Sequence, residues 1–374
     1  MAFNKPKFSR ELNAEFFTTL KKRVNLYFQQ NEMAPTGDKK MIFKTIFMFV
    51  LYLTPYFFIL FGNIESTWAM ISLWVLMGFG MAGIGLSVMH DANHGAFSKS
   101  KKINDLMGNS MNLIGSNAFV WKIQHNVLHH SFTNIEGADE DIHMPFVLRF
   151  SPHQKLRWFH RFQHFYAWFL YGLMTLLRLF VSDFIRLKHY KDLQLTGSPK
   201  NYRKELMISI AWKVFYVFYI LALPILLNPG FTGAIILSFL IMQFICGFIL
   251  AVIFQSAHVM PSCEYPLPNE EGKIENSWAV HELITTTNFS PKSRWFSWAI
   301  GGLNYQVEHH LFSNVSHVHY RALSKIVRQT AEEFNLPYNT EKSFISAIWN
   351  HAKMLRALGT GELDLAMAKV EKAA

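Results

Sequence analysis

Cysteine and charge are both scarce in this chain, and each scarcity excludes a class of protein. Two cysteines cannot build a disulfide framework, and Cys246 lies inside an apolar segment, where a thiol packs as a small hydrophobe. Charged residues are only 17% of the chain, whereas 51% of it is hydrophobic and 35 residues are phenylalanine. This balance is unlike that of a soluble protein. We therefore expect an integral membrane protein with a polar portion of moderate size.

Several familiar signals are also missing. Residues 1–40 are basic and mixed, and the first long apolar run begins near Met41, so no cleavable signal peptide is expected. We find no nucleic-acid-binding motif and expect no nucleic-acid partner. The net charge of +10 agrees with the positive charge that collects on the cytoplasmic side of membrane proteins, where anionic lipids and an acidic electron-donor protein would also meet it. Because repeats, low-complexity tracts and strand-rich blocks are absent, we expect an all-α fold.

Four apolar runs are long enough to cross a bilayer, which needs roughly 20 residues. They are Met41–Phe61, Thr67–Met89, Leu206–Leu227 and Phe231–Phe254. Short links at 62–66 and 228–230 join them into two helical hairpins, and the second link contains the turn signal Asn-Pro-Gly. We expect one membrane domain over residues 1–374, with a cytoplasmic or interfacial segment at 1–40 and a cytoplasmic helical cap formed by 90–205 and 255–374.

The distribution of lysine and arginine predicts the orientation of the spans. Neither link contains a cation, whereas the N-terminal segment, the stretch Asp91–Arg203 and the tail after His258 are basic. Positive loops stay in the cytoplasm, so both termini and the central stretch should lie there. His90 and His258 then lie where the second and fourth spans emerge on that side.

Other segments read as helices outside the spans. Ser9–Tyr27 places Leu12, Phe16, Leu20 and Val24 on one stripe, which predicts an amphipathic helix at the membrane interface. Trp158–Val181 is aromatic but carries Arg161 and Arg178, so we expect it to lie in the interface or to dip into it. Helices are also predicted for Ala322–Phe334 and Glu341–Leu358, with Gly359 and Gly361 as stop signals.

Three histidine groups follow the apolar runs and predict a metal centre. They are His90-x-x-x-His94, His125-x-x-x-His129-His130 and Gln306-x-x-His309-His310. Side chains four residues apart share a helix face, so His90 with His94, and His125 with His129, could each hold one metal, while His130 points toward a neighbouring position. Neutral imidazole suits iron, copper, zinc and nickel, and adjacent histidines suit a pair of metals.

Polar residues beside these groups are candidates for orienting the imidazoles. Asp91, Asn93, Asn304 and Glu308 could fix ring tautomers, and Gln306 offers an amide oxygen, which is a weaker ligand. Packing or surface roles are expected for the remaining histidines and for one acidic run. We expect His143, His153, His189 and His351 at the surface. His281, His317 and His319 are also expected there, although contacts with a metal ligand or a lipid headgroup stay open for them. His160 and His164 have the spacing of metal ligands but are expected to pack in an aromatic helix, and Asp139-Glu140-Asp141 is expected to be a solvated acidic run.

These motifs together resemble the three boxes of membrane fatty acid desaturases. The resemblance rests on His90-Asp-Ala-Asn-His94, on His125-Asn-Val-Leu-His-His130 with Thr133-Asn134 and 139–142 after it, on Phe254-Gln-Ser-Ala-His258, and on Asn304-Tyr-Gln-Val-Glu-His-His-Leu-Phe312. The glutamine that opens the third box is similar to that of the front-end subgroup. Ser313 departs from the proline that relatives often carry there, and we expect it to alter loop stiffness only.

The resemblance implies a four-span helical bundle with a cytoplasmic cap holding two iron ions. It implies that the seven boxed histidines and His258 ligate the iron, and that Gln306 occupies a position that holds histidine in other desaturases. Many front-end enzymes carry a fused cytochrome with a His-Pro-Gly-Gly motif, which this sequence lacks. Electrons are therefore expected from a separate donor such as a ferredoxin or a b-type cytochrome with its reductase.

The implied reaction is O₂-dependent formation of a cis double bond in an acyl-CoA or acyl-lipid, of a front-end type such as Δ6 on a linoleoyl chain. A hydroxylase or a sphingolipid enzyme on the same scaffold stays open, because the ligands can be shared. A zinc hydrolase is disfavoured because no His-Glu-x-x-His is present. A metal transporter would need polar ligands near mid-membrane, whereas these boxes lie outside the runs.

Overall fold

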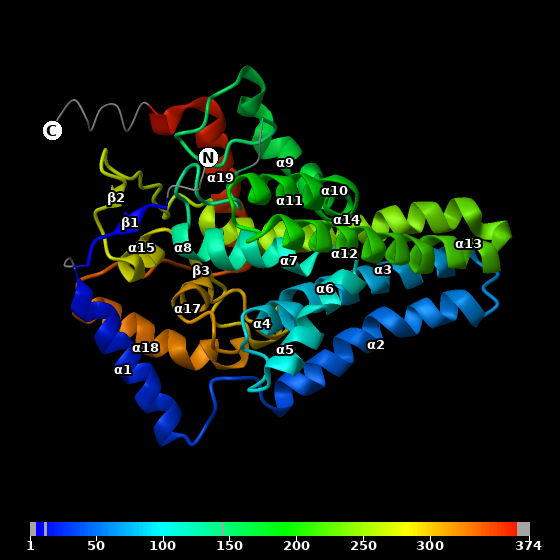
Figure 1. Ribbon diagram of the computed structural model, residues 1–374, viewed down its shortest axis with the longest axis horizontal. Helices are drawn as coiled ribbons and strands as arrows, with labels where there is room; N and C mark the ends of the chain where they lie inside the picture. Colours follow the sequence, from blue (N-terminus) through cyan, green and yellow to red (C-terminus); the bar gives the residue numbers. More distant parts are fainter. Residues whose placement is uncertain (1–4, 11–12, 144–145, 365–374) are drawn as a thin grey trace. The chain divides into compact units, whose positions relative to one another are not determined.

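The computed structural model describes residues 5–10, 13–143 and 146–364, and helices dominate it (Figure 1). The α-helices are α1 Ala14–Gln30, α2 Lys39–Phe61, α3 Thr67–Gly83, α4 His90–Asn93, α5 Lys101–Gly108, α6 Ser110–Leu113, α7 Ala118–Trp121, α8 His130–Phe132, α9 Gln163–Gly172, α10 Met174–Leu177, α11 Asp183–Asp192, α12 Pro199–Val217, α13 Leu223–Leu227, α14 Thr232–His258, α15 Trp278–Ile284, α16 Arg294–Ala299, α17 Gln306–Leu311, α18 Tyr320–Glu333 and α19 Phe344–Thr360.

Short π-helical and 3₁₀ segments connect or extend these helices. The π-helical segments are η1 Ile84–Met89, η2 Lys122–His129, η4 Arg178–Ser182 and η5 Phe218–Ala222, and the 3₁₀ segments are η3 Trp158–Phe162, η6 Pro229–Phe231 and η7 His317–His319. Two parallel strand pairs are described, β1 Lys7–Phe8 with β2 Lys273–Ile274, and β3 Asn288–Phe289 with β4 Thr340–Glu341. The predicted all-α class is confirmed.

Four helices are long and apolar enough to cross a membrane, as predicted. They run over Lys39–Phe61, Thr67–Asn93, Pro199–Leu227 and Pro229–His258. Each contains one of the predicted runs and extends it by a few residues. The protein is thus a multi-pass membrane protein. The aromatic segment after Trp158 forms two helices, Trp158–Gly172 and Met174–Asp192, which bend sharply at Leu173 and would add a fifth span if counted as one.

The chain divides into two compact units, each made of separate stretches of sequence. The first unit contains Thr36–Ile123 and Phe169–Ala251, and the second contains the described part of Asn4–Pro35 together with Gln124–Trp168 and the described part of the chain from Val252 onward. Residues 90–123 and 169–205 belong to the same unit as most of the span residues. Neighbouring helices in space, rather than the polarity of the sequence, define these boundaries.

Close helix packing in the first unit depends on glycine. Helices α2 and α3 lie side by side (Figure 1), and a Cβ on Gly80 would come within 2.7 Å of the backbone nitrogen of Tyr52. A Cβ on Gly247 of α14 would likewise lie 2.7 Å from the carbonyl oxygen of Gly172. Small residues let helix backbones approach closely inside a membrane, where lipid tails remove the hydrophobic driving force between helices.

A buried ion cluster in the first unit holds the start of α7. The Lys213 Nζ of α12 donates to the Asp183 carboxylate at 2.9 Å and to the Gly115 carbonyl at 3.1 Å. The same carboxylate accepts from the backbone N–H of Asn117 at 2.9 Å. The Asn117 side chain in turn caps α7 by accepting from the Val120 N–H at 2.9 Å. This cluster therefore connects the third span to the helix that leads into the second histidine box.

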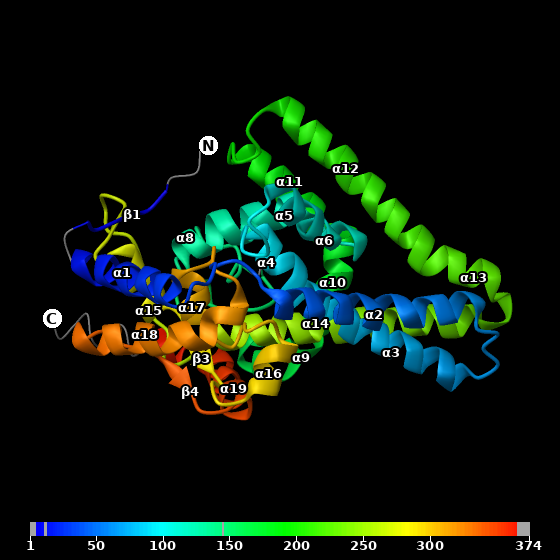
Figure 2. The ribbon, with the colours of Figure 1, turned by 90° about the horizontal axis from the view of Figure 1, so that it is seen from below.

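The N-terminal helix of the second unit differs from its prediction. Helix α1 begins at Ala14, and Leu12 lies outside the described residues. Its apolar stripe of Phe16, Leu20 and Val24 is buried in a core that includes Leu323 and Val327 of α18. The two helices lie side by side in both Figure 1 and Figure 2. The stripe expected to face lipid is thus covered by protein.

The two C-terminal helices are confirmed. Helix α18 covers Tyr320–Glu333 and α19 covers Phe344–Thr360, close to the predicted ranges. Gly361 caps α19 with a φ of 77°, a conformation that glycine adopts without strain. Gly359 lies inside α19 and does not end it. Because Gly359 has no side chain, α19 can approach the backbone at His160 closely.

Candidate metal centre

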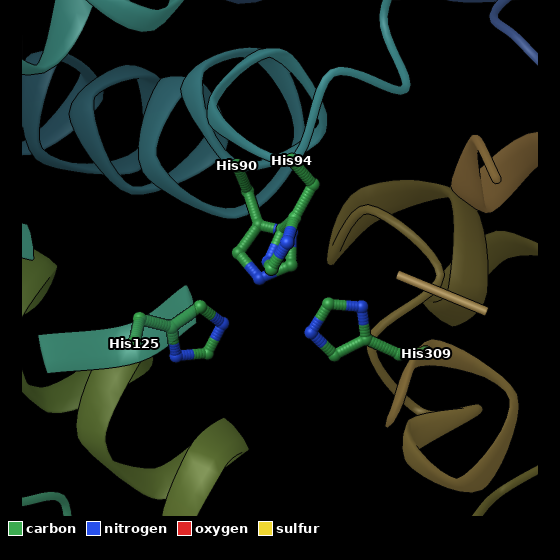
Figure 3. Close-up of side chains that lie close together, drawn as sticks. All are labelled: His90, His94, His125 and His309. Carbon is green, nitrogen blue, oxygen red and sulfur yellow. The ribbon is translucent and has the colours of Figure 1, made fainter. Parts of the chain in front are cut away.

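The first histidine box lies in the first unit at the end of the second span. The π-helical turn η1 is entirely buried, and α4 follows it with His90 and His94 one turn apart. Their rings stand next to each other with centroids 4.9 Å apart (Figure 3), as the spacing predicts. Both rings also contact the indole of Trp121, at 5.6 and 5.7 Å. Trp121 ends α7 and follows Asn117, whose backbone the ion cluster binds, by one helical turn.

A cluster of three histidines lies within the second unit. His129, His258 and His310 each place one ligand atom within 4.8 Å of the other two, and all three are buried. They come from η2, from the last residue of α14 and from α17. The centroids of the three rings are 4.7 to 4.9 Å apart. Residues far apart in sequence thus form a compact group of imidazoles.

The Nδ1 atoms of this cluster are each engaged by an acceptor. The His129 Nδ1 is 3.0 Å from a carboxylate oxygen of Asp139, and the His310 Nδ1 is 2.7 Å from one of Glu282. The His258 Nδ1–H donates to the Thr285 carbonyl at 3.3 Å, and its Nε2 has no hydrogen-bond partner among the described residues. Acceptors at Nδ1 leave Nε2 for a metal, which is the usual support of a metal-bound imidazole.

A second histidine group in the same unit surrounds His130. The His125 and His130 Nε2 atoms are 3.2 Å apart. His125 and His309 turn their rings toward each other (Figure 3), with centroids 5.7 Å apart. The His309 Nδ1 hydrogen-bonds to the Tyr320 hydroxyl at 3.1 Å. The π-helical winding of η2 differs from the regular helix we expected, and it brings residues five apart onto one face.

Burial and carboxylates shift the pKa values of these groups in opposite directions. Burial alone would lower the pKa of His129, but Asp139 and Asp141 outweigh it and raise that pKa to about 9. Burial lowers the pKa of His125, although Asp141 opposes this. Burial also raises the pKa of Glu282 to about 8. Asp139 and Asp141 thus favour positive charge at His129, which suits a metal cation.

Gln306, the first residue of the third box, is fully buried. Neither its amide oxygen nor its amide nitrogen has a hydrogen-bond partner among the described residues. A buried amide without partners is costly, since it has lost its water without replacement. This observation, together with the unpartnered His258 Nε2 and the all-imidazole donor set, fits residues that receive a bound metal.

Hydrogen bonds are described for three of the four predicted orienting residues. The Asn93 side chain donates to the Gly108 carbonyl at 3.3 Å, and the Asn304 side chain donates to the Ser290 carbonyl at 3.4 Å. Asp91 is buried in the first unit. Glu308 accepts from the Asn288 amide and the Tyr338 hydroxyl, both at 2.8 Å, and burial raises its pKa to about 7. These bonds connect Glu308 to strand β3 and to the segment before β4.

The residues that hold the imidazoles include several that the sequence interpretation missed. Asp139 was expected in a solvated acidic run but is buried against His129. Glu282 and Tyr320 were not singled out, and Thr133 bonds to Glu282 at 2.9 Å. A signal for Glu282 was present, because it is the one acid in the apolar helix Trp-Ala-Val-His-Glu-Leu-Ile. Local spacing could not show which histidine it would meet.

Four histidines expected at the surface are buried instead: His281, His317, His319 and His351. The His281 Nε2–H donates to the Thr133 carbonyl at 2.7 Å, and His351 donates from Nδ1 to the Val259 carbonyl at 2.9 Å. The rings of His319 and Phe28 are 5.1 Å apart. His160 bonds to the Phe146 carbonyl at 3.0 Å, in agreement with the packing role expected for it. Imidazole buries easily when one nitrogen finds a carbonyl.

Comparison with known proteins agrees with this site. Residues 66–342 match the family model described as fatty acid desaturase. An acyl-lipid (8-3)-desaturase of Physcomitrium patens is 37% identical over 362 residues, covering 94% of this chain and 73% of its own length. The sn-1 linoleoyl-lipid 6-desaturases of Arthrospira platensis and Synechocystis sp. are each 32% identical, with 89% and 92% of this chain and 89% and 95% of the relatives covered. The chain belongs to the fatty acid desaturase family, and it is therefore an oxidoreductase.

Proposed function

We propose that this chain is a front-end desaturase that acts on acyl chains of membrane lipids and uses two iron ions. The observation that carries the proposal is the cluster of His129, His258 and His310, whose Nδ1 atoms are held by acceptors and whose Nε2 atoms are left for a metal. The names of two relatives support the lipid substrate: an acyl-lipid (8-3)-desaturase and an sn-1 linoleoyl-lipid 6-desaturase. In both cases the match covers most of the relative's length.

The proposed ligand set divides the histidines between two metals. His129, His258 and His310 would hold one iron. The resemblance to desaturases implies that the other boxed histidines, His90, His94, His125, His130 and His309, also ligate iron. His130 lies beside both groups of the second unit, since its ring is 4.4 Å from that of His309 and 4.3 Å from that of His310. Gln306 would complete the site through its unpartnered amide.

The iron would supply the redox chemistry with O₂ that an unactivated acyl C–H bond needs, because no side-chain acid or base can remove such a hydrogen. The chain itself positions and shields the site. Asp139 and Glu282 keep the Nδ1 protons of His129 and His310 in place, which orients both Nε2 atoms. Every proposed histidine ligand of the second unit is at most 6% exposed, so bulk water is excluded. We place this site on the cytoplasmic side.

Product analysis tests the proposal. The full chain is expressed in a host without polyunsaturated lipids, linoleate is supplied, and the double bonds of the extracted lipids are located by mass spectrometry. We expect a new cis double bond on the carboxyl side of the existing ones, in glycerolipids. A hydroxylated product would replace the proposal by a hydroxylase, and modified sphingolipids alone would replace the substrate class.

Alanine substitutions test the ligands. His94→Ala, His129→Ala and His309→Ala should each abolish product and reduce bound iron while the protein remains in the membrane, because one lost ligand disrupts the site. His189→Ala is the matched control, since His189 is exposed. His351, which the sequence suggested as a silent position, is unsuitable because it is buried. Full activity in one of the three variants would remove that residue from the set.

Gln306 needs a separate test because an amide is a weak ligand. Gln306→Ala should strongly reduce turnover while retaining much of the iron. Gln306→His should retain iron and still disturb the reaction, since imidazole differs in reach. Iron content and desaturated product are measured for both. Normal turnover in Gln306→Ala would assign the residue to packing alone.

A further inference from the structure

A desaturase needs electrons from outside, and one surface of the second unit is suited to receive them. This inference rests on the proposed function. Each turnover takes two hydrogens from the acyl chain and, with two electrons and two protons, reduces O₂ to two waters. The surface is a groove of about 1140 Å³ whose walls include the strand pair β1 and β2 and the first residue of α15, Trp278.

Trp278 connects this groove to the histidines. Its indole ring lines the groove, and its Nε1–H donates to the carbonyl of His130 at 3.1 Å. The His130 ring in turn lies 4.3 Å from the ring of His310. Phe8 lines the same groove and lies 5.0 Å from the ring of His281. The groove is therefore separated from the proposed metal ligands by one aromatic side chain and one hydrogen bond.

The groove and its border carry an excess of positive charge. Lys7 and Arg10 line it and are exposed, and Lys273 also lines it but is paired with Glu271 at 2.7 Å. Helix α1 continues the surface, because its Phe17 packs edge-on against Trp278 with centroids 5.4 Å apart.

The exposed face of this helix adds Lys21 and Lys22, with Glu15 as its acidic residue, and Glu275 is the carboxylate that lines the groove. Glu270, exposed beside the lining residue Asn269, is a further carboxylate. Among the described residues the four cations Lys7, Arg10, Lys21 and Lys22 thus outnumber the three carboxylates that the ion pair leaves, which are Glu15, Glu270 and Glu275. A basic surface of this kind steers an acidic partner.

We propose that this groove docks a small, acidic one-electron carrier protein and that Trp278 marks the point where its electrons enter the enzyme. Two such carriers, each going from its reduced to its oxidised form, deliver the two electrons of one turnover one at a time. The interface is small and electrostatic, as is common for brief redox encounters. Binding should accordingly weaken as salt screens the charges.

Charge reversal tests the docking surface. The full chain in lipid nanodiscs is titrated with an acidic [2Fe–2S] ferredoxin at several salt concentrations. Lys7→Glu with Arg10→Glu should raise the Kd about ten-fold or more at low salt and flatten its salt dependence. Lys292→Glu with Arg294→Glu is the matched control, because these cations are exposed on another part of the second unit. A basic carrier, cytochrome c, should not bind the wild type.

Substitution of Trp278 tests the electron route apart from activity. Anaerobic reduction of the iron is followed spectroscopically, with either reduced ferredoxin or dithionite as the donor. At saturating ferredoxin, Trp278→Leu should slow reduction by ferredoxin at least several-fold, whereas the rate with dithionite should stay as in the wild type. Trp278→Phe keeps a ring but loses the bond to the His130 carbonyl, so its rate of reduction by ferredoxin should lie between those of the wild type and Trp278→Leu. If Trp278→Leu loses iron, the rate of Trp278→Phe tests the electron route instead.

Two results would overturn the inference. One is equal ferredoxin binding by the Lys7/Arg10 variant and its control. The other is ferredoxin-driven reduction at the wild-type rate in both Trp278 variants, or an equal slowing with dithionite. Neither result would bear on the proposed function, since desaturated product from the wild type establishes that independently.

Discussion

At the scale of single residues, the histidines depend on buried carboxylates that lie outside the boxes. Asp139 and Glu282 are each at most 1% exposed and each meets one Nδ1 atom. An imidazole held in this way is both oriented and made a better ligand. Glu308, which belongs to the third box by sequence, bonds to Asn288 and Tyr338 instead. Proximity in the chain is thus a poor guide to which carboxylate supports the metal.

We predict that Glu282→Gln weakens iron binding by about 10- to 100-fold, because the neutral amide cannot hold the His310 proton as the carboxylate does. Iron retained against a graded series of chelator concentrations measures the effect. Glu308→Gln is the matched control, since Glu308 is equally buried but contacts no histidine in the bonds described above. Equal iron retention in the two variants would contradict the role given to Glu282.

His351 allows a prediction about pH. Burial lowers its pKa from 6.5 to about 4, although its bond to the Val259 carbonyl opposes the shift. The unfolded chain therefore binds a proton at pH values where the folded protein does not. The contribution of His351 to the free energy of unfolding is therefore present above pH 6.5 and is lost as pH falls toward 4.

In His351→Leu this contribution disappears, so thermal stability should fall less steeply below pH 6.5 than in the wild type. Above that pH the variant should be less stable by about 1 kcal/mol, because the Val259 carbonyl loses its donor. Thermal unfolding in detergent over this pH range measures both effects. His189→Leu, at an exposed position, should leave the pH profile unchanged; an identical change there would refute the assignment.

At the scale of elements, the π-helical segment η2 contains His125 and His129 of the second box, and α7 leads into it. Contacts from other helices hold the N-terminus of α7 in place. The carboxylate of Asp183 and the ammonium of Lys213 are buried together, and they bind the backbone at Asn117 and Gly115. An ion pair inside a membrane protein is retained only where its geometry satisfies both charges.

We predict that Lys213→Met destabilises the protein by about 2 kcal/mol, because Asp183 loses a charged hydrogen bond and keeps only Arg178, at 3.2 Å, as a cationic partner. Lys204→Met lies on the same helix and should change stability by no more than about 0.5 kcal/mol, since its contact with Glu205 is long and exposed. Equilibrium unfolding in mixed micelles compares them. A Lys213→Met protein as stable as Lys204→Met would show that the cluster contributes little.

At the scale of the whole molecule, four spans and the lysine and arginine distribution define a topology. The two links between spans, at 62–66 and 228–230, contain no cation. We predict that both links are non-cytoplasmic and that the histidine boxes are cytoplasmic. Cysteines introduced at Glu65, Asn228 and Lys102 are labelled with an impermeant reagent; the native Cys246 and Cys263 are buried. Labelling of Glu65 and Lys102 from the same side would exclude this orientation.

The sequence by itself determined the spans and the all-α class, and it predicted which histidines bind metal. These depend on local properties: the length of an apolar run, the scarcity of charge within it and the spacing of side chains along a helix. The pair His90 and His94 needs only one helical turn to come together, and their rings meet as the spacing predicts.

Only the tertiary structure decided which groups support those histidines and which are buried. Glu282 meets His310, and the apolar stripe of α1 meets α18 rather than lipid, through contacts between residues distant in sequence. His351 looks polar and exposed in the sequence, yet a carbonyl 92 residues away accepts its proton. Burial is a property of the folded surface as a whole. The local sequence pattern therefore predicts which interactions a side chain can make, whereas tertiary packing determines which residue it contacts.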